Sequence, residues 1–317
     1  MNIVFLDRST FPDHIDIPSP QVTHSWTSYD ETDPAMVVDR LAQADIVVTN
    51  KVVLNAQVLA QCPTVKMVAV TATGVNNVDL EYCRSKNIAV ANVSGYAANT
   101  VAEHILSFMF SLSRNQPSFL QDQRQSGWQQ ATQFCRFVAP IRDLKNQVIG
   151  IVGSGAIGSA LGEKCSALGM QVHFAERPGA DEIRSGKIAF DDLLAVADFV
   201  ALCCPLAENN YHLMGAEQFS HMKSSAFLIN TSRGPLVNEA DLVAAIQGQQ
   251  IAGAALDVAE QEPLSASSPL NALTQQPNFI LTPHIAWASD SAMNRLLAGV
   301  MNNIENFVNG HRDQFLV

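Results

Sequence analysis

The sequence carries little charge, and the smaller part of that charge is positive. Only 15% of its 317 residues are charged, and 19 lysines and arginines face 30 aspartates and glutamates, which gives a formal net charge of −11. The basic residues are scattered along the chain, whereas nucleic acids and anionic membranes bind basic patches. We therefore expect neither as a partner, although the composition leaves room for a local cationic pocket.

The chain also lacks a long apolar run. Its longest apolar-rich stretch, VAEHILSFMFSLS, contains Glu103 and His104 and is shorter than the roughly twenty residues that span a membrane. Its first residues, MNIVFLD, have neither the basic start nor the cleavage site of a secretory signal. These absences predict a cytoplasmic protein, and 47% apolar residues suffice for a sizeable globular core.

Cysteine pairs at metal-binding spacing are missing as well. None of the six cysteines belongs to a CxxC motif, and no histidine cluster accompanies them. Cys203 and Cys204 continue the apolar run DFVALCC and are interpreted as reduced residues of a buried strand. No metal site is expected.

What the sequence does contain is a regular alternation of strand and helix patterns. The β-branched runs NIVFL, DIVVT, KMVAV and IAVANV alternate with helical periodicity over the first hundred residues. The alternation starts again at residue 148 with VIGIVG, QVHFAE, FVALCC, AFLIN, IAGAALDV and FILTPH. This pattern predicts two α/β units with doubly wound parallel sheets, and a last helix over about 289–309 that is free to return to the first unit.

A strong helical pattern and a polar segment separate the two alternations. The stretch NTVAEHILSFMFSLSRN predicts a helix capped by Asn99 or Thr100, with Pro117 after its end and with His104 as a packing residue. The Gln-rich segment that follows, which includes Trp128, is interpreted as an extended arm or an interface segment.

The stretch VIGIVGSGAIGSALGEKC contains a G-x-G-x-x-G motif formed by Gly153, Gly155 and Gly158. The motif follows a strand and opens a helix, which is the context that dinucleotide binding requires. The three glycines would permit a tight turn, close approach of a pyrophosphate and close helix packing, in that order. The motif therefore predicts a dinucleotide site.

The next strand, QVHFAE, ends on Glu176, close to the roughly twenty-residue spacing of an acid that binds the adenosine ribose. A carboxylate there disfavours the 2′-phosphate of NADP, so NAD(H) is the expected cofactor. NADP(H) is not excluded, because the neighbouring Arg177 could attract that phosphate.

Three chemically suited residues follow later strands: Arg233 in NTSRGP, Glu262 in VAEQEP and His284 in LTPHIA. Strand ends of a doubly wound sheet meet at one edge, so the three should converge. An arginine can bind a substrate carboxylate and polarise its carbonyl, and a histidine can exchange the hydroxyl proton. A carboxylate beside the histidine would orient its ring and favour its protonated form.

Each residue taken alone also has a structural explanation. Arg233 could pair with an acidic loop, Glu262 could be a solvated acid, and His284 could be a buried histidine.

The segments GIVGSGAIGSALGEKCSALGMQV, FLINTSRGPLVNEADLVAAI, GAALDVAEQEPL and LTPHIAWAS resemble the D-isomer-specific 2-hydroxyacid dehydrogenases nearly end to end. The resemblance implies a substrate domain of residues 1–98 plus 288–317, a dinucleotide domain of residues 99–287, and an active-site cleft between them. It also implies a homodimer, with a dimerisation helix and arm at about 99–140.

The resemblance assigns site roles residue by residue. It makes Arg233 the carboxylate ligand, Glu262 the partner of His284 and His284 the acid/base, with Asn50 and the backbone amides of Thr73 and Gly74 also at the substrate. It places Ala156 and Ile157 at the pyrophosphate and Thr231 and Asp257 near the nicotinamide. Relatives often carry arginine at the position of Ala156, so its absence weakens the expected hold on the cofactor.

FAERPG and HIAWAS look most like the glycerate dehydrogenase or hydroxypyruvate reductase branch. The expected reaction is reduction of hydroxypyruvate or glyoxylate to D-glycerate or glycolate, and the reverse oxidation. One alternative is a reductase of a bulkier 2-oxo acid such as 2-ketogluconate. Another is a non-catalytic NADH-sensing scaffold, which would keep the same site residues.

Overall fold

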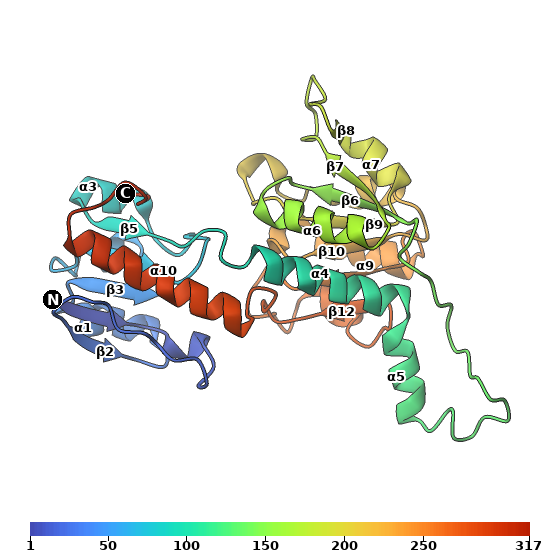
Figure 1. Ribbon diagram of the computed structural model, residues 1–317, viewed down its shortest axis with the longest axis horizontal. Helices are drawn as coiled ribbons and strands as arrows, with labels where there is room; N and C mark the ends of the chain where they lie inside the picture. The colour runs from blue at the N-terminus through green and yellow to red at the C-terminus, as the bar shows by residue number, and fades with distance from the viewer. The chain divides into compact units, whose positions relative to one another are not determined.

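The computed structural model describes residues 1–317, and the chain divides into two compact units. One unit consists of Met1–Tyr96 with Ala288–Val317, and the other consists of Ala97–Trp287 (Figure 1). Each unit is built on its own all-parallel sheet, of five strands in the first and seven in the second. The predicted fold class, two doubly wound parallel α/β units, is confirmed.

The sheet of the first unit has the order β2-β1-β3-β4-β5. Its strands are β1 Asn2–Phe5, β2 Ser25–Ser28, β3 Ile46–Thr49, β4 Met67–Val70 and β5 Ala89–Ala91. Every residue of β3 and β4 is buried, since helices cover both faces, and this explains their unbroken apolar runs. The order reverses beside β1, so the carboxyl ends of β1 and β3 form a switch point where ligands bind in such sheets.

Four helices belong to the first unit: α1 Val37–Leu41, α2 Ala56–Leu59, α3 Leu80–Lys86 and α10 Asp290–Val308. The last of these comes from the far end of the chain and packs on β4 and β5 (Figure 1). The Ser289 side chain caps α10 by accepting from the Ala292 N–H. The final residues then bond to the edge strand, because the Leu316 N–H donates to the Val90 carbonyl at 2.8 Å.

The sheet of the second unit has the order β12-β11-β10-β9-β6-β7-β8, with its switch point between β6 and β9. Its strands are β6 Val148–Val152, β7 Gln171–Ala175, β8 Lys187–Ile188, β9 Phe199–Leu202, β10 Phe227–Asn230, β11 Gly253–Leu256 and β12 Phe279–Leu281. Its helices are α4 Ala98–Ser113, α5 Gln116–Arg124, α6 Ala156–Ala167, α7 Phe190–Val196, α8 Ala216–His221 and α9 Glu239–Gln247. Helices α4 and α6 pack against each other in front of the sheet in the view of Figure 1.

The predicted start of α4 is wrong. Ala97 is the N-cap residue and no side chain caps the helix, so Asn99 and Thr100 lie inside its first turn. A capping side chain contributes only about 1 kcal/mol, which the burial of Val101 and Ala102 on the packed face outweighs.

The first part of the Gln-rich segment is a helix, which the sequence analysis did not predict. This helix is α5, in whose first turn Pro117 fits because that turn needs no N–H from it. Residues 125–147 then contain neither helix nor strand. Across the whole chain, no helix has the length and apolar character needed to cross a bilayer.

Candidate active site

The loop between β6 and α6 carries the three glycines of the fingerprint, and two of them are sterically required. Gly153 has a φ of +113°, and a Cβ there would lie 2.7 Å from the backbone of Cys203. A Cβ on Gly158 would lie 2.0 Å from the Gly153 carbonyl oxygen. The first glycine therefore makes the turn, and the last lets α6 pack against it.

The start of α6 fits an anionic group. Gly155 is its N-cap, no side chain caps the helix, and a Cβ on Gly155 would have no heavy atom within 4 Å. Ala156 is exposed and Ile157 is half-buried, so the first turn is accessible. The free N–H groups and the dipole of this twelve-residue helix suit the pyrophosphate of a dinucleotide.

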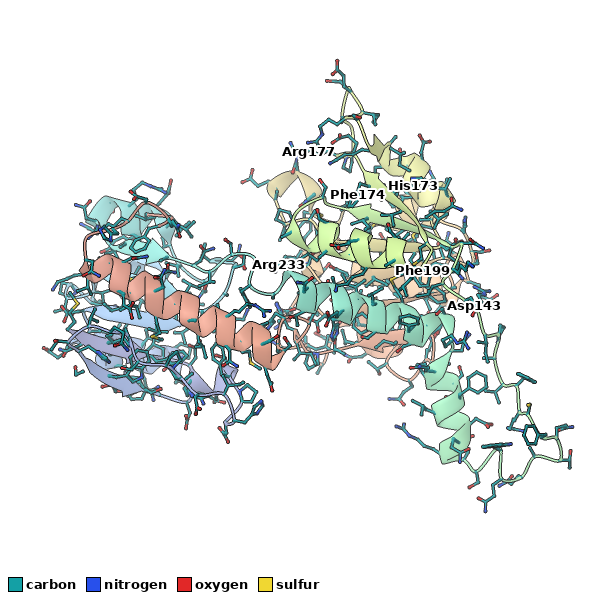
Figure 2. All side chains as sticks on the ribbon, viewed as in Figure 1. Asp143, His173, Phe174, Arg177, Phe199 and Arg233 are labelled. Atoms are coloured by element: carbon teal, nitrogen blue, oxygen red, sulfur yellow. The ribbon has the colours of Figure 1, made fainter.

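Arg233 lies in the loop that follows β10, at the carboxyl end of the sheet, and is labelled in Figure 2. Its half-buried guanidinium donates one hydrogen bond, to the Ser232 carbonyl at 2.7 Å, and forms no ion pair. The next residue is glycine because a Cβ on Gly234 would lie 1.9 Å from the backbone of Ala259. Most donors of this cation are therefore available to an anionic ligand.

Glu262 and His284 form the pair that the sequence predicts. The His284 Nδ1 and the Glu262 Oε2 lie 2.7 Å apart, and the Ala259 N–H donates to the other carboxylate oxygen at 3.1 Å. An ionised carboxylate only accepts, so Nδ1 carries the proton and donates it. The Nε2 atom is then the ring nitrogen that can exchange a proton with a ligand.

The loop of His284 is fixed from beneath by Asp257. This buried carboxylate accepts from the Thr282 hydroxyl at 2.5 Å and from the N–H groups of Ile285 and Ala286 at 2.9 and 2.8 Å. The His284 N–H donates to the Asp257 carbonyl at 2.8 Å. These bonds hold His284 at a φ of +57°, a conformation that side-chain-bearing residues rarely adopt. The contact of Asp257 with a nicotinamide stays a prediction.

His104 on α4 does more than pack. Its ring meets Phe108 edge-on, but its Nε2 also lies 3.2 Å from the Thr282 hydroxyl. Because that hydroxyl donates to Asp257, the His104 Nε2–H must donate to the hydroxyl oxygen. Burial lowers the pKa of His104, and the Asp257 carboxylate offsets this only in part. No sequence pattern indicates this contact, since it joins residues far apart in the chain.

Glu176 follows β7 as expected, but its carboxylate already has protein partners. The Arg184 side chain binds both of its oxygens, with Nε 2.6 Å from Oε2 and with Nη2 on Oε1. The Arg177 N–H also donates to Oε1 at 2.8 Å, and the Arg184 N–H donates to Oε2 at 3.3 Å. The Arg184 pairing and these backbone bonds hold the pKa of Glu176 well below its usual range.

Two buried threonine hydroxyls at strand ends have no hydrogen-bond partner: that of Thr231 after β10 and that of Thr71 after β4. Buried polar groups are nearly always bonded, so an unpaired one at a strand end suits a ligand contact. Thr231 was predicted to lie near the nicotinamide, and its unpaired hydroxyl fits that group. Thr71 was not predicted.

The remaining predicted residues lie in the first unit. The Asn50 N–H follows β3 and donates to Asp7 at 2.9 Å. The Thr73 hydroxyl donates to the Val93 carbonyl at 2.9 Å, and Gly74 follows in the loop after β4. Their contacts with a substrate stay predictions.

Asp7 is a further residue that the sequence analysis missed. It is buried after β1 and accepts from the N–H groups of Asn50, Lys51 and Val52 and from the Thr49 hydroxyl. It therefore fixes the loop that carries Asn50.

A known protein family matches more than half of the chain. Residues 106–286 match the family described as D-isomer specific 2-hydroxyacid dehydrogenase, NAD binding domain. The chain belongs to this family. It is therefore an oxidoreductase that uses a nicotinamide cofactor, as the sequence analysis predicted.

Relatives match the dehydrogenase almost end to end. It is 46% identical over 309 residues to a putative 2-hydroxyacid dehydrogenase of Haemophilus influenzae, covering 97% of this chain and 98% of that protein. It is 38% identical over 310 residues to a glycerate dehydrogenase of Methylorubrum extorquens, covering 97% and 96%. The crystal structure of the TT0316 protein of Thermus thermophilus matches with a TM-score of 0.86 at 26% identity, covering 100% of both chains.

The dehydrogenase has no group of three or more His, Cys, Asp or Glu side chains that could hold a metal ion. All six cysteines are free.

Proposed function

We propose that this dehydrogenase reduces hydroxypyruvate or glyoxylate to D-glycerate or glycolate and catalyses the reverse oxidation. The observation that carries the proposal is the 2.7 Å contact of His284 with Glu262, in the same unit as an arginine without an ion pair. Relatives named glycerate dehydrogenase and hydroxypyruvate reductase, 38% and 33% identical, support the substrate class.

The roles follow from the chemistry of the side chains. The Arg233 guanidinium binds the substrate carboxylate through two parallel hydrogen bonds and polarises the adjacent carbonyl. The His284 Nε2–H donates its proton to the carbonyl oxygen, while Glu262 stabilises the imidazolium from the other side of the ring. The bound nicotinamide supplies the hydride that C2 receives.

The unit Ala97–Trp287 binds the dinucleotide in this proposal, and the unit formed by the two chain ends contributes substrate contacts. The glycine loop and the open start of α6 support the first assignment. The unpaired Thr71 hydroxyl and the loop held by Asp7 support the second.

The test is the initial rate of absorbance loss at the reduced nicotinamide band, with hydroxypyruvate, glyoxylate, pyruvate and 2-ketogluconate in parallel. Fast turnover of hydroxypyruvate or glyoxylate is the expected result. Turnover of 2-ketogluconate alone would reassign the enzyme to bulkier 2-oxo acids. Nucleotide binding without turnover of any substrate would favour a sensing scaffold.

Variants at Arg233 test the assignment of its anion. Arg233→Ala should lower kcat/KM roughly 100-fold or more, since charge-assisted bonds to a carboxylate are each worth about 1.5–3 kcal/mol. Arg233→Lys is the matched control that keeps the charge and loses the planar fork of donors. The dissociation constant of the reduced nucleotide should stay within about threefold in both. A loss of nucleotide affinity instead would place Arg233 at the cofactor.

The segment after α5 supports a homodimer. Trp128, Phe134 and Phe137 are 58%, 90% and 78% exposed. Large apolar side chains that are exposed together often mark an interface with another protein chain. Arg136 binds Asp122 through both carboxylate oxygens and orders the segment. Sedimentation should show a dimer, and the double variant Phe134→Ser, Phe137→Ser should be monomeric. A wild-type monomer would remove this assignment.

A further inference from the structure

The adenosine end of the proposed dinucleotide site carries two arginines besides the single acid Glu176, so its charge differs from what the acid alone suggests. Glu176 directly follows β7, the position from which an acid normally binds both ribose hydroxyls. An ionised carboxylate offers about four lone-pair positions, and here four N–H donors already meet its two oxygens. Little acceptor capacity is left for a ribose hydroxyl.

Arg184 uses only part of its own capacity on this pair. Its side chain is 56% exposed, whereas that of Glu176 is 2% exposed. Two of the five guanidinium N–H groups point to Glu176, which leaves three for another acceptor. The remaining N–H donors of Arg184 are therefore exposed, beside the Glu176 carboxylate whose charge the arginine neutralises.

Arg177 adds a second cation to the same loop. It is exposed, forms no ion pair, and lies at the foot of the loop that projects between β7 and β8 (Figure 2). The other acids of this loop, Asp181 and Glu182, are exposed and pair with neither arginine. Two arginines of this loop thus accompany one carboxylate that is already bonded.

From this arrangement we infer that Arg184 is a cofactor-specificity residue, and that its pairing with Glu176 lets the site accept an adenosine 2′-phosphate, hence NADPH. A phosphate needs donors and positive charge where a ribose hydroxyl needs an acceptor. The inference rests on the proposed function in that the glycine loop and α6 hold the dinucleotide. It departs from the simpler expectation that an acid after this strand excludes NADP.

The test is calorimetric titration of the full chain with adenosine 2′,5′-bisphosphate and with 5′-AMP. Neither nucleotide carries a nicotinamide, so binding is measured independently of turnover and of the substrate. Wild type should bind the bisphosphate at least as tightly as 5′-AMP. Arg184→Gln should weaken the bisphosphate about tenfold or more, since it removes a cation and exposes Glu176 to the phosphate, and 5′-AMP should change by less than about threefold.

Two further variants control the result. Arg184→Lys keeps the charge without the fork and should weaken the bisphosphate by less than the glutamine variant. Arg114→Gln removes an exposed arginine–aspartate pair far along the chain, with Asp143, and should change neither affinity. The dissociation constants of NADPH and NADH, followed by nucleotide fluorescence, should shift in the same directions.

Two outcomes would overturn the inference while leaving the dinucleotide site intact. In one, wild type binds 5′-AMP but not the bisphosphate, which would mean that Arg184 leaves Glu176 to the ribose. In the other, Arg184→Gln weakens both nucleotides alike. If neither nucleotide binds, the dinucleotide site of the proposed function fails and the inference fails with it.

Discussion

Asp7 in the first unit and Glu176 in the second are both buried carboxylates in loops that follow a parallel strand, yet their partners differ. Asp7 accepts hydrogen bonds from neutral backbone and hydroxyl groups only, whereas Glu176 is bound by a guanidinium as well. Burial raises the pKa of Asp7 despite its hydrogen bonds, while Arg184 lowers that of Glu176. The neutral donors of Asp7 hold its loop in place, but the burial of the carboxylate charge still costs free energy. At Glu176 the positive charge of Arg184 offsets that cost, and this is where a charged ligand is expected.

Asp257 extends this comparison, because it has neutral donors like Asp7 but its loop carries the proposed acid/base. Asp257→Asn replaces one carboxylate oxygen by an NH2 group, so the donors of Thr282, Ile285 and Ala286 share one acceptor atom fewer. The loop should then allow His284 to shift. A misplacement of about 1 Å costs roughly 100-fold in rate, so kcat should fall by about that factor. Steady-state rates measure this change in kcat. An unchanged kcat would show that the loop keeps His284 in place without this carboxylate.

His104→Gln is the milder change in the same network. An amide N–H can still donate to the Thr282 hydroxyl, so kcat should fall only a few-fold, roughly the effect of one neutral hydrogen bond of about 1 kcal/mol. His104→Ala removes the donor and should cost more. Equal effects of both variants on kcat would make His104 a packing residue only.

Asp7→Asn tests the neutral-donor side of the comparison. The new amide nitrogen would face the N–H of Asn50 or Lys51, which should lower the free energy of unfolding by about 1–3 kcal/mol. Urea unfolding measures this change, and nucleotide binding by the second unit should not move. The matched variant Glu176→Gln should lose less stability, because Arg184 can turn to solvent. If Glu176→Gln lost more free energy of unfolding than Asp7→Asn, the contrast drawn between the neutral partners of Asp7 and the cationic partner of Glu176 would be wrong.

The sequence predicts the buried strands but not the strands at the edges of the two sheets. Buried strands such as β3 and β9 are recognisable as apolar runs, and the glycine loop is recognisable by its spacing. The edge strands β2 and β8 were missed because SWTS is largely exposed and KI is only two residues long. Such strands form because a neighbouring strand offers hydrogen bonds, which their own sequence does not encode.

The candidate site divides in the same way. Arg233, Glu262 and His284 were predictable because each follows a recognisable strand and carries distinctive chemistry. The contact between Glu262 and His284 came with that prediction. The pairing of Glu176 with Arg184 did not, because it depends on how the loop between β7 and β8 folds back, and no periodicity or spacing marks that contact.

The smallest expected effect concerns how the contributions of Asp7 and Glu176 to stability depend on pH. The two dependences should have opposite signs. The folded-state pKa of Asp7 lies above its ordinary value of 3.8, so the folded protein binds the extra proton and stability falls as pH rises through the folded-state pKa. The folded-state pKa of Glu176 lies below its ordinary value of 4.5, so its stabilising contribution is present above 4.5 and is lost as pH falls through the depressed pKa.

Urea unfolding of wild type, Asp7→Asn and Glu176→Gln between about pH 3.5 and 7 measures both signs, since neither amide titrates in that range. The advantage of wild type over Asp7→Asn should shrink as pH rises, and its advantage over Glu176→Gln should shrink as pH falls below 4.5. Slopes of the same sign would mean that Arg184 does not stay on Glu176 in solution. The ribose position would then carry an available carboxylate, and the simpler expectation of NAD(H) would regain its physical basis.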